Sequence, residues 1–172
     1  MSTVFLSGSR KMGRLNDPIR ERLLNMMRQE HDIVVGDASG ADKAMQSFFA
    51  DHEYAFVTVY CSAGKCRNNV GNWPVQSVEV DPKLRGRAFY TVKDKAMARI
   101  AEYGFILWDG SSKGSLTNAE TLLGEGKKVA LYHRPTTQFL NLKTQADLVP
   151  LLEMPSHDAR DDQSTLPFDK AS

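Results

Sequence analysis

The stretch Asp32–Asp42, with the sequence DIVVGDASGAD, runs from a short apolar segment through a glycine-containing turn into a helical pattern. The apolar segment ends at Gly36, and an uninterrupted apolar run bounded by glycine is typical of a strand that is buried in a parallel sheet. Residues 41–50 continue with apolar side chains at helical spacing. Alternation of such strands with helices marks βαβ units, so this stretch predicts a parallel α/β sheet.

The same alternation extends along the chain in both directions. We expect strands over residues 3–7, 32–36, 55–60, 105–108 and 129–132, and helices over residues 18–29, 41–50, 93–103 and 116–124. Asp17 is the expected N-cap of the first helix, with Pro18 at its first position. Residues 139–140 and 148–152 are expected to add one strand and a short helix, whereas residues 61–84 show no period and are expected to form a long loop. Right-handed crossovers place helices on both faces, so the pattern predicts a three-layer α/β sandwich with a mainly parallel sheet of five or six strands.

The length of 172 residues is enough for one domain with a full core, which we expect over residues 1–153. Residues 154–172 are polar and poor in apolar side chains, so a flexible C-terminal tail is expected there. Within this tail, the segment Gln163–Phe168 (QSTLPF) is similar to the short peptides that dock on DNA sliding clamps, which makes such a clamp a candidate partner. The alternative is a tail whose Leu166 and Phe168 rest on the domain surface.

The charge balance argues against two classes of partner. Lys and Arg total 22 and Asp and Glu total 21, so the net charge is +1. Bulk charge of this size does not drive binding to nucleic acid or to a membrane surface, so neither is expected. No apolar run reaches the roughly 18 residues of a membrane span, and no basic segment precedes the first apolar run, so no signal peptide is expected. Two cysteines, Cys61 and Cys66, do not make a disulfide framework, and we expect a cytoplasmic location.

Three of the expected strands end in turns rich in glycine and small hydroxyl residues: Gly8–Arg10, Gly36–Asp42 and Asp109–Ser115. In a parallel sheet these turns meet at the edge where ligands bind. Glycine lets backbone N–H groups approach an anion, and the following helix presents the positive end of its dipole, so a phosphate is the expected guest. The candidate ligand-binding residues in these turns are Gly8, Ser9, Arg10, Gly36, Asp37, Gly40, Asp42, Asp109, Gly110, Ser111, Lys113, Gly114 and Ser115. The alternative is that such turns only satisfy backbone geometry, with their charged residues in solvent.

Other segments could extend this site. Arg67–Trp73 (RNNVGNW) combines an arginine, a tryptophan and three amides, which suit a base and a phosphate. Its alternative role is a covering flap whose amides cap turns. Arg85 and Arg87 precede a helix and are further phosphate candidates. Cys61 and Cys66 have C-x4-C spacing without a second pair, so no metal is expected, and no other cofactor is predicted.

The segments Gly8–Arg10, Val35–Asp42 and Trp108–Ser115 together resemble the SLOG superfamily. This group joins the DprA-like DNA-processing proteins with the Lonely Guy cytokinin-activating phosphoribohydrolases. The resemblance covers about residues 2–133 and implies a Rossmann-like fold that binds a nucleotide or a nucleotide-derived ligand. A homo-oligomer is a further option that the sequence leaves open.

The resemblance is incomplete at the position that carries catalysis in the Lonely Guy group. Those enzymes contain Pro-Gly-Gly-x-Gly-Thr-x-x-Glu, whereas here Gly114-Ser115 matches the Gly-Thr step and Asn118 stands in place of the glutamate. Glu120 lies two residues further along the helix, which turns its side chain away by ~200°. An amide can bind a hydroxyl but cannot act as the base that N-glycoside hydrolysis needs. Ligand binding is therefore favoured over hydrolysis.

We therefore expect a nucleotide-binding sensor or regulatory domain, and two alternatives stay open. An N-glycosidase acting on nucleoside monophosphates would draw its catalytic residue from Asp42, Glu120 or Asn118. A DprA-like DNA-processing protein would bind nucleic acid, for which a net charge of +1 gives no broad basic surface.

Overall fold

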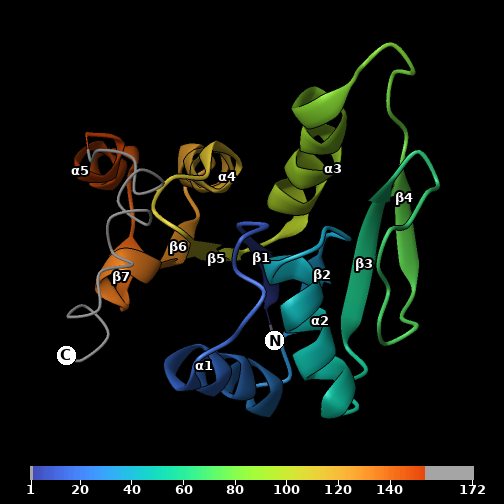
Figure 1. Cartoon of the computed structure of the whole chain (residues 1–172), viewed down its shortest axis with the longest axis horizontal. Helices are drawn as coiled ribbons and strands as arrows, with labels where there is room; N and C mark the ends of the chain where they lie inside the picture. Colours follow the sequence, from blue (N-terminus) through green and yellow to red (C-terminus); the bar gives the residue numbers. More distant parts are fainter. Residues whose placement is uncertain (1, 154–172) are drawn as a thin grey trace, which may run out of the picture.

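The strand β1 (Thr3–Gly8) lies inside a seven-stranded sheet, between β2 (Asp32–Val35) and β5 (Tyr103–Trp108) (Figure 1). The structure is a computed structural model that describes residues 2–153. The other strands are β3 (Val57–Ser62), β4 (Val75–Val78), β6 (Lys128–His133) and β7 (Gln138–Leu142). Their order is β4-β3-β2-β1-β5-β6-β7, and every neighbouring pair is parallel except β6–β7. The predicted mainly parallel sheet is confirmed.

Helices cover both faces of this sheet, which confirms the predicted three-layer sandwich (Figure 1). One face carries α1 (Asp17–Arg28) and α2 (Ala41–Asp51), and the other carries α3 (Gly86–Ile100), α4 (Lys113–Gly124) and α5 (Val149–Leu152). Two short 3-10 turns, Arg134–Thr136 and Gln145–Leu148, flank β7.

The core has two halves, one on each side of the sheet. Successive residues of a strand point to opposite faces, so Leu6 of β1 packs with Phe49 of α2 while its neighbour Phe5 packs on the side of Met97 from α3. All four side chains are at most 1% exposed. This two-sided burial explains why the strands are continuous apolar runs and not alternating patterns.

The first helix begins one residue earlier than its sequence pattern predicts. Asn16, not Asp17, is the N-cap, and its Oδ1 accepts the backbone N–H of Ile19 at 3.1 Å. The Nδ2 of Asn16 also donates to the Tyr132 hydroxyl at 2.7 Å, which ties the start of α1 to β6.

The segment 61–84 differs from the predicted long loop. It contains β4, which extends the sheet beyond β3 and accounts for the seventh strand. α3 then begins at Gly86, well before the expected Lys93. β4 is a short edge strand whose residues are mostly exposed, so it has no apolar pattern to predict it.

Within residues 2–153 no helix is both long and apolar enough to cross a membrane. The predicted tail over 154–172 and its Gln163–Phe168 segment lie outside the described residues.

Candidate functional site

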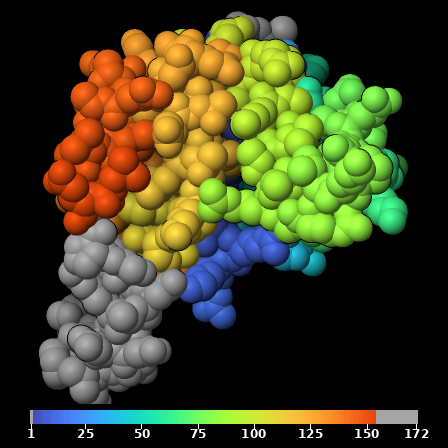
Figure 2. All heavy atoms as spheres, turned by 90° about the horizontal axis from the view of Figure 1, so that it is seen from above, coloured from blue at the N-terminus to red at the C-terminus, as the bar shows by residue number. Residues whose placement is uncertain are grey.

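A cavity of about 510 Å³ opens at the carboxyl ends of β1 and β5. Figure 2 shows a cleft between the yellow-green α3 and the gold α4, with dark blue atoms of the N-terminal strand at its floor. The chain runs outward from β1 through β2 to β4 and then returns to β5, so the crevice lies at the topological switch point of the sheet, where such folds bind ligands. Its lining residues are Ser7, Gly8, Ser9, Arg10, Lys11, Ala38, Asp42, Arg67, Gly86, Arg87, Tyr90, Lys93, Asp94, Asp109, Ser111, Ser112, Gly114, Ser115 and Asn118.

The turns after β1 and β5 are joined to each other. Ser9 Oγ donates to Asp109 Oδ2 at 2.8 Å, and both side chains are buried. Asp109 also accepts the backbone N–H groups of Ser111 at 3.0 Å and Ser112 at 2.8 Å. Burial would raise the pKa of Asp109, but these hydrogen bonds outweigh it and hold the pKa below its ordinary value. Asp109 therefore acts as an ionised brace of the two turns.

The first turn of α4 faces the cavity through Gly114 and Ser115. The N-cap Ser112 makes no side-chain capping bond, so its side chain does not occupy the backbone N–H groups of this turn. These groups lie at the positive end of the helix dipole and can donate to a ligand. A Cβ at Gly114 would meet nothing within 4 Å, which shows that the space beside this turn is open. This geometry is suited to an anion.

A buried carboxyl and a buried amine meet on the opposite wall. The backbone N–H of Ala38 donates to Asp42 Oδ2 at 3.2 Å. A Cβ at Gly36 would lie 2.7 Å from that oxygen and 3.1 Å from Lys93 Nζ, so glycine makes room for both groups. Burial raises the pKa of Asp42 to about 7, against the opposing charge of Lys93. Asp42 can therefore exchange a proton near neutral pH.

Through Asp94, Lys93 also contacts a second set of polar side chains, which includes Asn118. Its Nζ lies 3.0 Å from Asp94 Oδ1, and the lysine is only 3% exposed. Asn118 Nδ2 donates to Ser7 Oγ at 2.8 Å and to Asp94 Oδ2 at 3.4 Å. The position that the resemblance assigns to a catalytic glutamate is thus an amide that donates its protons to other side chains.

Arg67 enters the cavity from the segment after β3 and is held by Asp37. Its Nη2 donates to Asp37 Oδ1 at 2.6 Å, and its backbone N–H donates to Asp37 Oδ2 at 2.9 Å. Burial would raise the pKa of Asp37, but these bonds from Arg67 hold it below its ordinary value. Asn68 Nδ2 donates to the carbonyl of Asp37 at 2.8 Å. Asp37 therefore positions Arg67 and does not itself line the cavity.

Tyr90 of α3 gathers three cationic side chains around its ring. The guanidinium carbon of Arg67 lies 4.0 Å from the ring centre, that of Arg10 lies at 5.7 Å, and Lys93 Nζ lies at 5.8 Å. These cations come from three separate segments of the chain. Two of them also form ion pairs with carboxylates, Arg67 with Asp37 and Lys93 with Asp94.

The structure brings most of the predicted site residues together in one cavity. Those that line it are Gly8, Ser9, Arg10, Asp42, Arg67, Asp109, Ser111, Gly114, Ser115 and Asn118. Those that do not line it are Gly36, Asp37, Gly40, Arg85, Gly110, Lys113 and Glu120.

Several of the residues outside the lining have another visible role. Gly40 has a φ of +84° and packs against the backbone of Arg10, which leaves no room for a side chain. Arg85 turns its guanidinium back to the carbonyls of Pro82 and Leu84, at 2.6 and 3.0 Å. Glu120 is exposed, as its rotation from the motif position predicts.

Sequence reasoning missed the contribution of α3. Tyr90, Lys93 and Asp94 lie at helical spacing on one face of this helix and line the cavity together with Gly86. Arg87, which the sequence offered as a phosphate candidate, also lines it. The available signal was this i, i+3, i+4 spacing, which was hidden because the helix was expected to begin only at Lys93.

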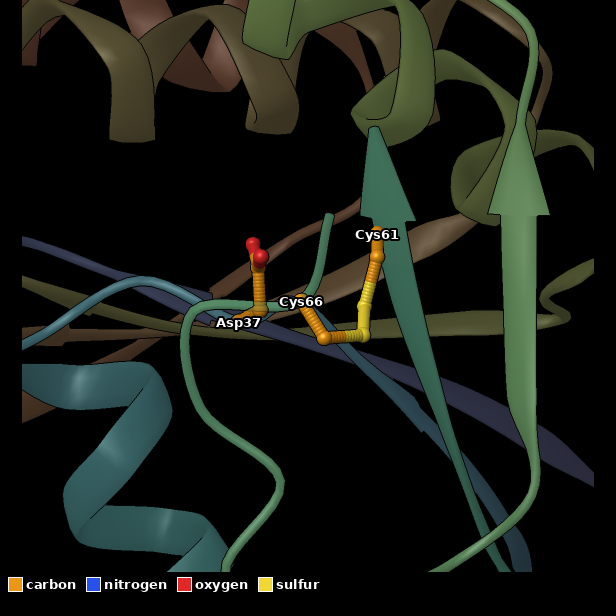
Figure 3. A group of neighbouring side chains, drawn as sticks. All are labelled: Asp37, Cys61 and Cys66. Atoms are coloured by element: carbon orange, nitrogen blue, oxygen red, sulfur yellow. A yellow bond between two sulfur atoms is a disulfide. The ribbon is translucent and has the colours of Figure 1, made fainter. Parts of the chain in front are cut away.

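Cys61 and Cys66 form a disulfide, which the sequence did not predict (Figure 3). Asp37 lies beside the two sulfurs, and one oxygen or sulfur atom of each residue is within 4.8 Å of the others. Both carboxylate oxygens of Asp37 already accept hydrogen bonds from Arg67. We therefore interpret these three residues as a disulfide beside the Asp37–Arg67 ion pair and not as a set of metal ligands.

Comparison with known proteins identifies the fold. No family model and no curated protein matches the sequence. DNA processing protein A from Helicobacter pylori, solved in a study of its single-stranded DNA binding mode, superposes with a TM-score of 0.60 at 15% identity. The match covers 98% of this chain and 81% of that one. The Rossmann-like α/β fold implied by the sequence motifs is confirmed.

Proposed function

We propose that this chain binds a nucleotide or a nucleotide-derived ligand in the cavity and acts as a sensor or regulatory domain. The observation that carries the proposal is the convergence of the open first turn of α4 with Arg10, Arg67 and Lys93 around one crevice. A helix N-terminus and clustered cations are the chemistry that holds a phosphate.

The remaining groups suit the rest of a nucleotide. The cavity volume of about 510 Å³ is in the range of small-molecule sites. Asn118 and Asp94 offer polar atoms for ribose hydroxyls, and the Arg67–Tyr90 stack offers a flat surface for a base. The phosphate is assigned to the turn Ser9–Arg10 and the first turn of α4.

A second candidate function is cleavage of the N-glycosidic bond of a nucleoside monophosphate. One observation favours it: burial brings the pKa of Asp42 to about 7 inside the same cavity, where a carboxyl can serve as acid or base. Against it stands Asn118, an amide at the position of the catalytic glutamate.

A titration panel separates these functions. The full chain is titrated with AMP, ADP, GMP, CMP and a short oligothymidylate, and each mixture is assayed for free base by chromatography. Thermal stabilisation by the mononucleotides without base release supports a binding domain. Base release supports the glycosidase. Binding of the oligonucleotide alone overturns both and favours a single-strand binder, as the structural relative is.

A further inference from the structure

We propose that Cys61 and Cys66 form a redox site that sets the position of Arg67, so that the oxidised chain binds a nucleoside phosphate more tightly than the reduced chain. This inference rests on the nucleotide site proposed above and assigns it a regulation.

A tight turn brings the two cysteines face to face. Ser62 and Lys65 pair as an antiparallel bridge, and the Lys65 N–H donates to the Ser62 carbonyl at 3.1 Å. The two residues between them, Ala63 and Gly64, have φ angles of +53° and +75°, as in the tight turns of β-hairpins. Cys61 and Cys66 are the next pair outward, with Cα atoms 5.0 Å apart, a spacing that suits a disulfide. The turn therefore keeps the thiols close when the bond is open.

The disulfide is coupled to the cavity through one peptide unit. Cys66 directly precedes Arg67, whose backbone N–H and guanidinium both bind Asp37. The rest of the segment is held by Gln46, which contacts the Asn68 carbonyl at 3.2 Å and the Val70 N–H at 2.9 Å. With the disulfide formed, Arg67 is fixed from both sides. Without it, the side towards Cys66 gains conformational freedom that ligand binding must remove.

The two cysteine residues differ in exposure, which favours attack at one of them. Cys61 is fully buried in β3, whereas Cys66 is exposed. A thiolate of a dithiol reductant attacks Cys66 Sγ, forms a mixed disulfide there, and releases the Cys61 thiolate, which takes up a proton. The second thiol of the reductant then displaces Cys66. Two electrons pass to the protein, which ends with two thiols, and the reductant ends as a disulfide.

Oxidation by a disulfide oxidant is the reverse exchange. Disulfides in reducing compartments are usually transient or redox-sensing, so a cytoplasmic chain would carry the thiols at rest and close the bond under oxidative conditions. Arg67 would then be held in place, and the nucleotide affinity would rise.

The test compares oxidised and reduced full chain with AMP as the first probe and the other mononucleotides of the panel in reserve. Thiol alkylation and mass spectrometry fix the redox state, isothermal titration gives the affinity, and amide hydrogen exchange reports residues 66–70. We expect the oxidised chain to bind about fivefold more tightly and to exchange more slowly at Arg67. Cys66→Ser cannot form the disulfide, so its affinity and its exchange rate should match those of the reduced chain with or without oxidant. Cys61→Ala, which removes the other cysteine, should give the same result.

Three outcomes overturn the inference: no disulfide under disulfide oxidants, equal affinity in the two states, or equal exchange at Arg67. The double variant Cys61→Ser/Cys66→Ser, treated with the same reductant, controls for effects of the reagent. If no mononucleotide binds in either state, the proposed function fails. Hydrogen exchange then still decides whether the disulfide controls Arg67.

Discussion

Ser9 and Asp109, separated by 100 residues in the chain, are joined by a hydrogen bond of 2.8 Å inside the protein. One belongs to the turn after β1 and the other to the turn after β5. Because the acceptor is an ionised and buried carboxylate, the bond is charge-assisted and holds both turns in one arrangement.

Replacing the donor should therefore weaken the fold and the site together. For Ser9→Ala we expect the free energy of unfolding to fall by about 1–3 kcal/mol, because a charged acceptor loses a buried partner. Nucleotide affinity should fall as well, since the phosphate turn loses its brace. Urea denaturation and AMP titration measure the two effects. Ser39→Ala is the control, because Ser39 is exposed in the neighbouring turn. Equal stability of the two variants would contradict the role of this bond.

Asp42 predicts a dependence of stability on pH. Its pKa of about 7 in the folded chain lies above the ordinary aspartate value of 3.8, so the folded state holds the proton that the unfolded state releases. The contribution of Asp42 to stability is therefore full below pH 4 and is lost as the pH rises towards 7. Relative to wild type, Asp42→Asn should gain roughly 2 kcal/mol between pH 5 and pH 7.

Urea denaturation at several pH values measures this gain for Asp42→Asn. Asp51→Asn, an exposed substitution in the same helix, should run parallel to wild type. If Asp42→Asn also ran parallel, the burial of a proton on Asp42 would be disproved. If base release is detected in the panel, the same variant should abolish it.

Gly114 tests the position of the phosphate. A Cβ at this position would meet no atom of another part of the protein within 4 Å, so Gly114→Val should keep the fold while its methyl groups fill the space beside the first turn of α4. We expect loss of nucleotide affinity by at least about tenfold. Gly13→Val is the matched control, because Gly13 also has open space around it and does not line this cavity. Wild-type affinity in Gly114→Val would disprove the assigned phosphate site.

The Asp37–Arg67 pair predicts a coupling energy. Asp37 has a side chain only 1% exposed, so Arg67→Met leaves a buried carboxylate without its main partner, and the free energy of unfolding should fall by about 2 kcal/mol. Asp37→Asn in the Arg67→Met background should recover part of this loss. A double-mutant cycle measured by denaturation gives the coupling. Arg20→Met removes the exposed pair with Asp17 and should change stability little.

The sequence predicted the parts of the site that follow apolar strands. Leu6, Val35 and Leu107 are wholly buried, so the runs that contain them mark strands, and the turns that follow are then fixed to one edge of the sheet. The motifs at these turns predicted the fold, and about half of the residues that line the cavity belong to them. The Rossmann-like fold could therefore be predicted from short segments at strand ends.

The rest of the site could not be predicted from periodicity because it lies in segments without a buried pattern. β4 is mostly exposed, and the first turns of α3 are exposed or only partly buried. Neither segment therefore has the apolar periodicity from which a strand or helix is predicted. Lys93 illustrates the difficulty. It is a charged residue that is buried beside the carboxylate of its neighbour Asp94 and the carboxyl group of Asp42 from α2. Only the three-dimensional arrangement shows that Asp42 reaches this lysine.

The place of β1 between β2 and β5 has a consequence for synthesis of the chain. Val4 of β1 can pair with Ile33 of β2 early in synthesis, but its partner on the other side, Tyr103 of β5, is synthesised 70 residues after Ile33. Until then one edge of β1 has no strand to pair with, and Ser9 has no Asp109. Long-range pairing of this kind is slow, and an open apolar edge is prone to aggregate. Nascent chains should therefore need protection until β5 and α4 emerge, and the cavity proposed to bind a nucleotide should be completed only then.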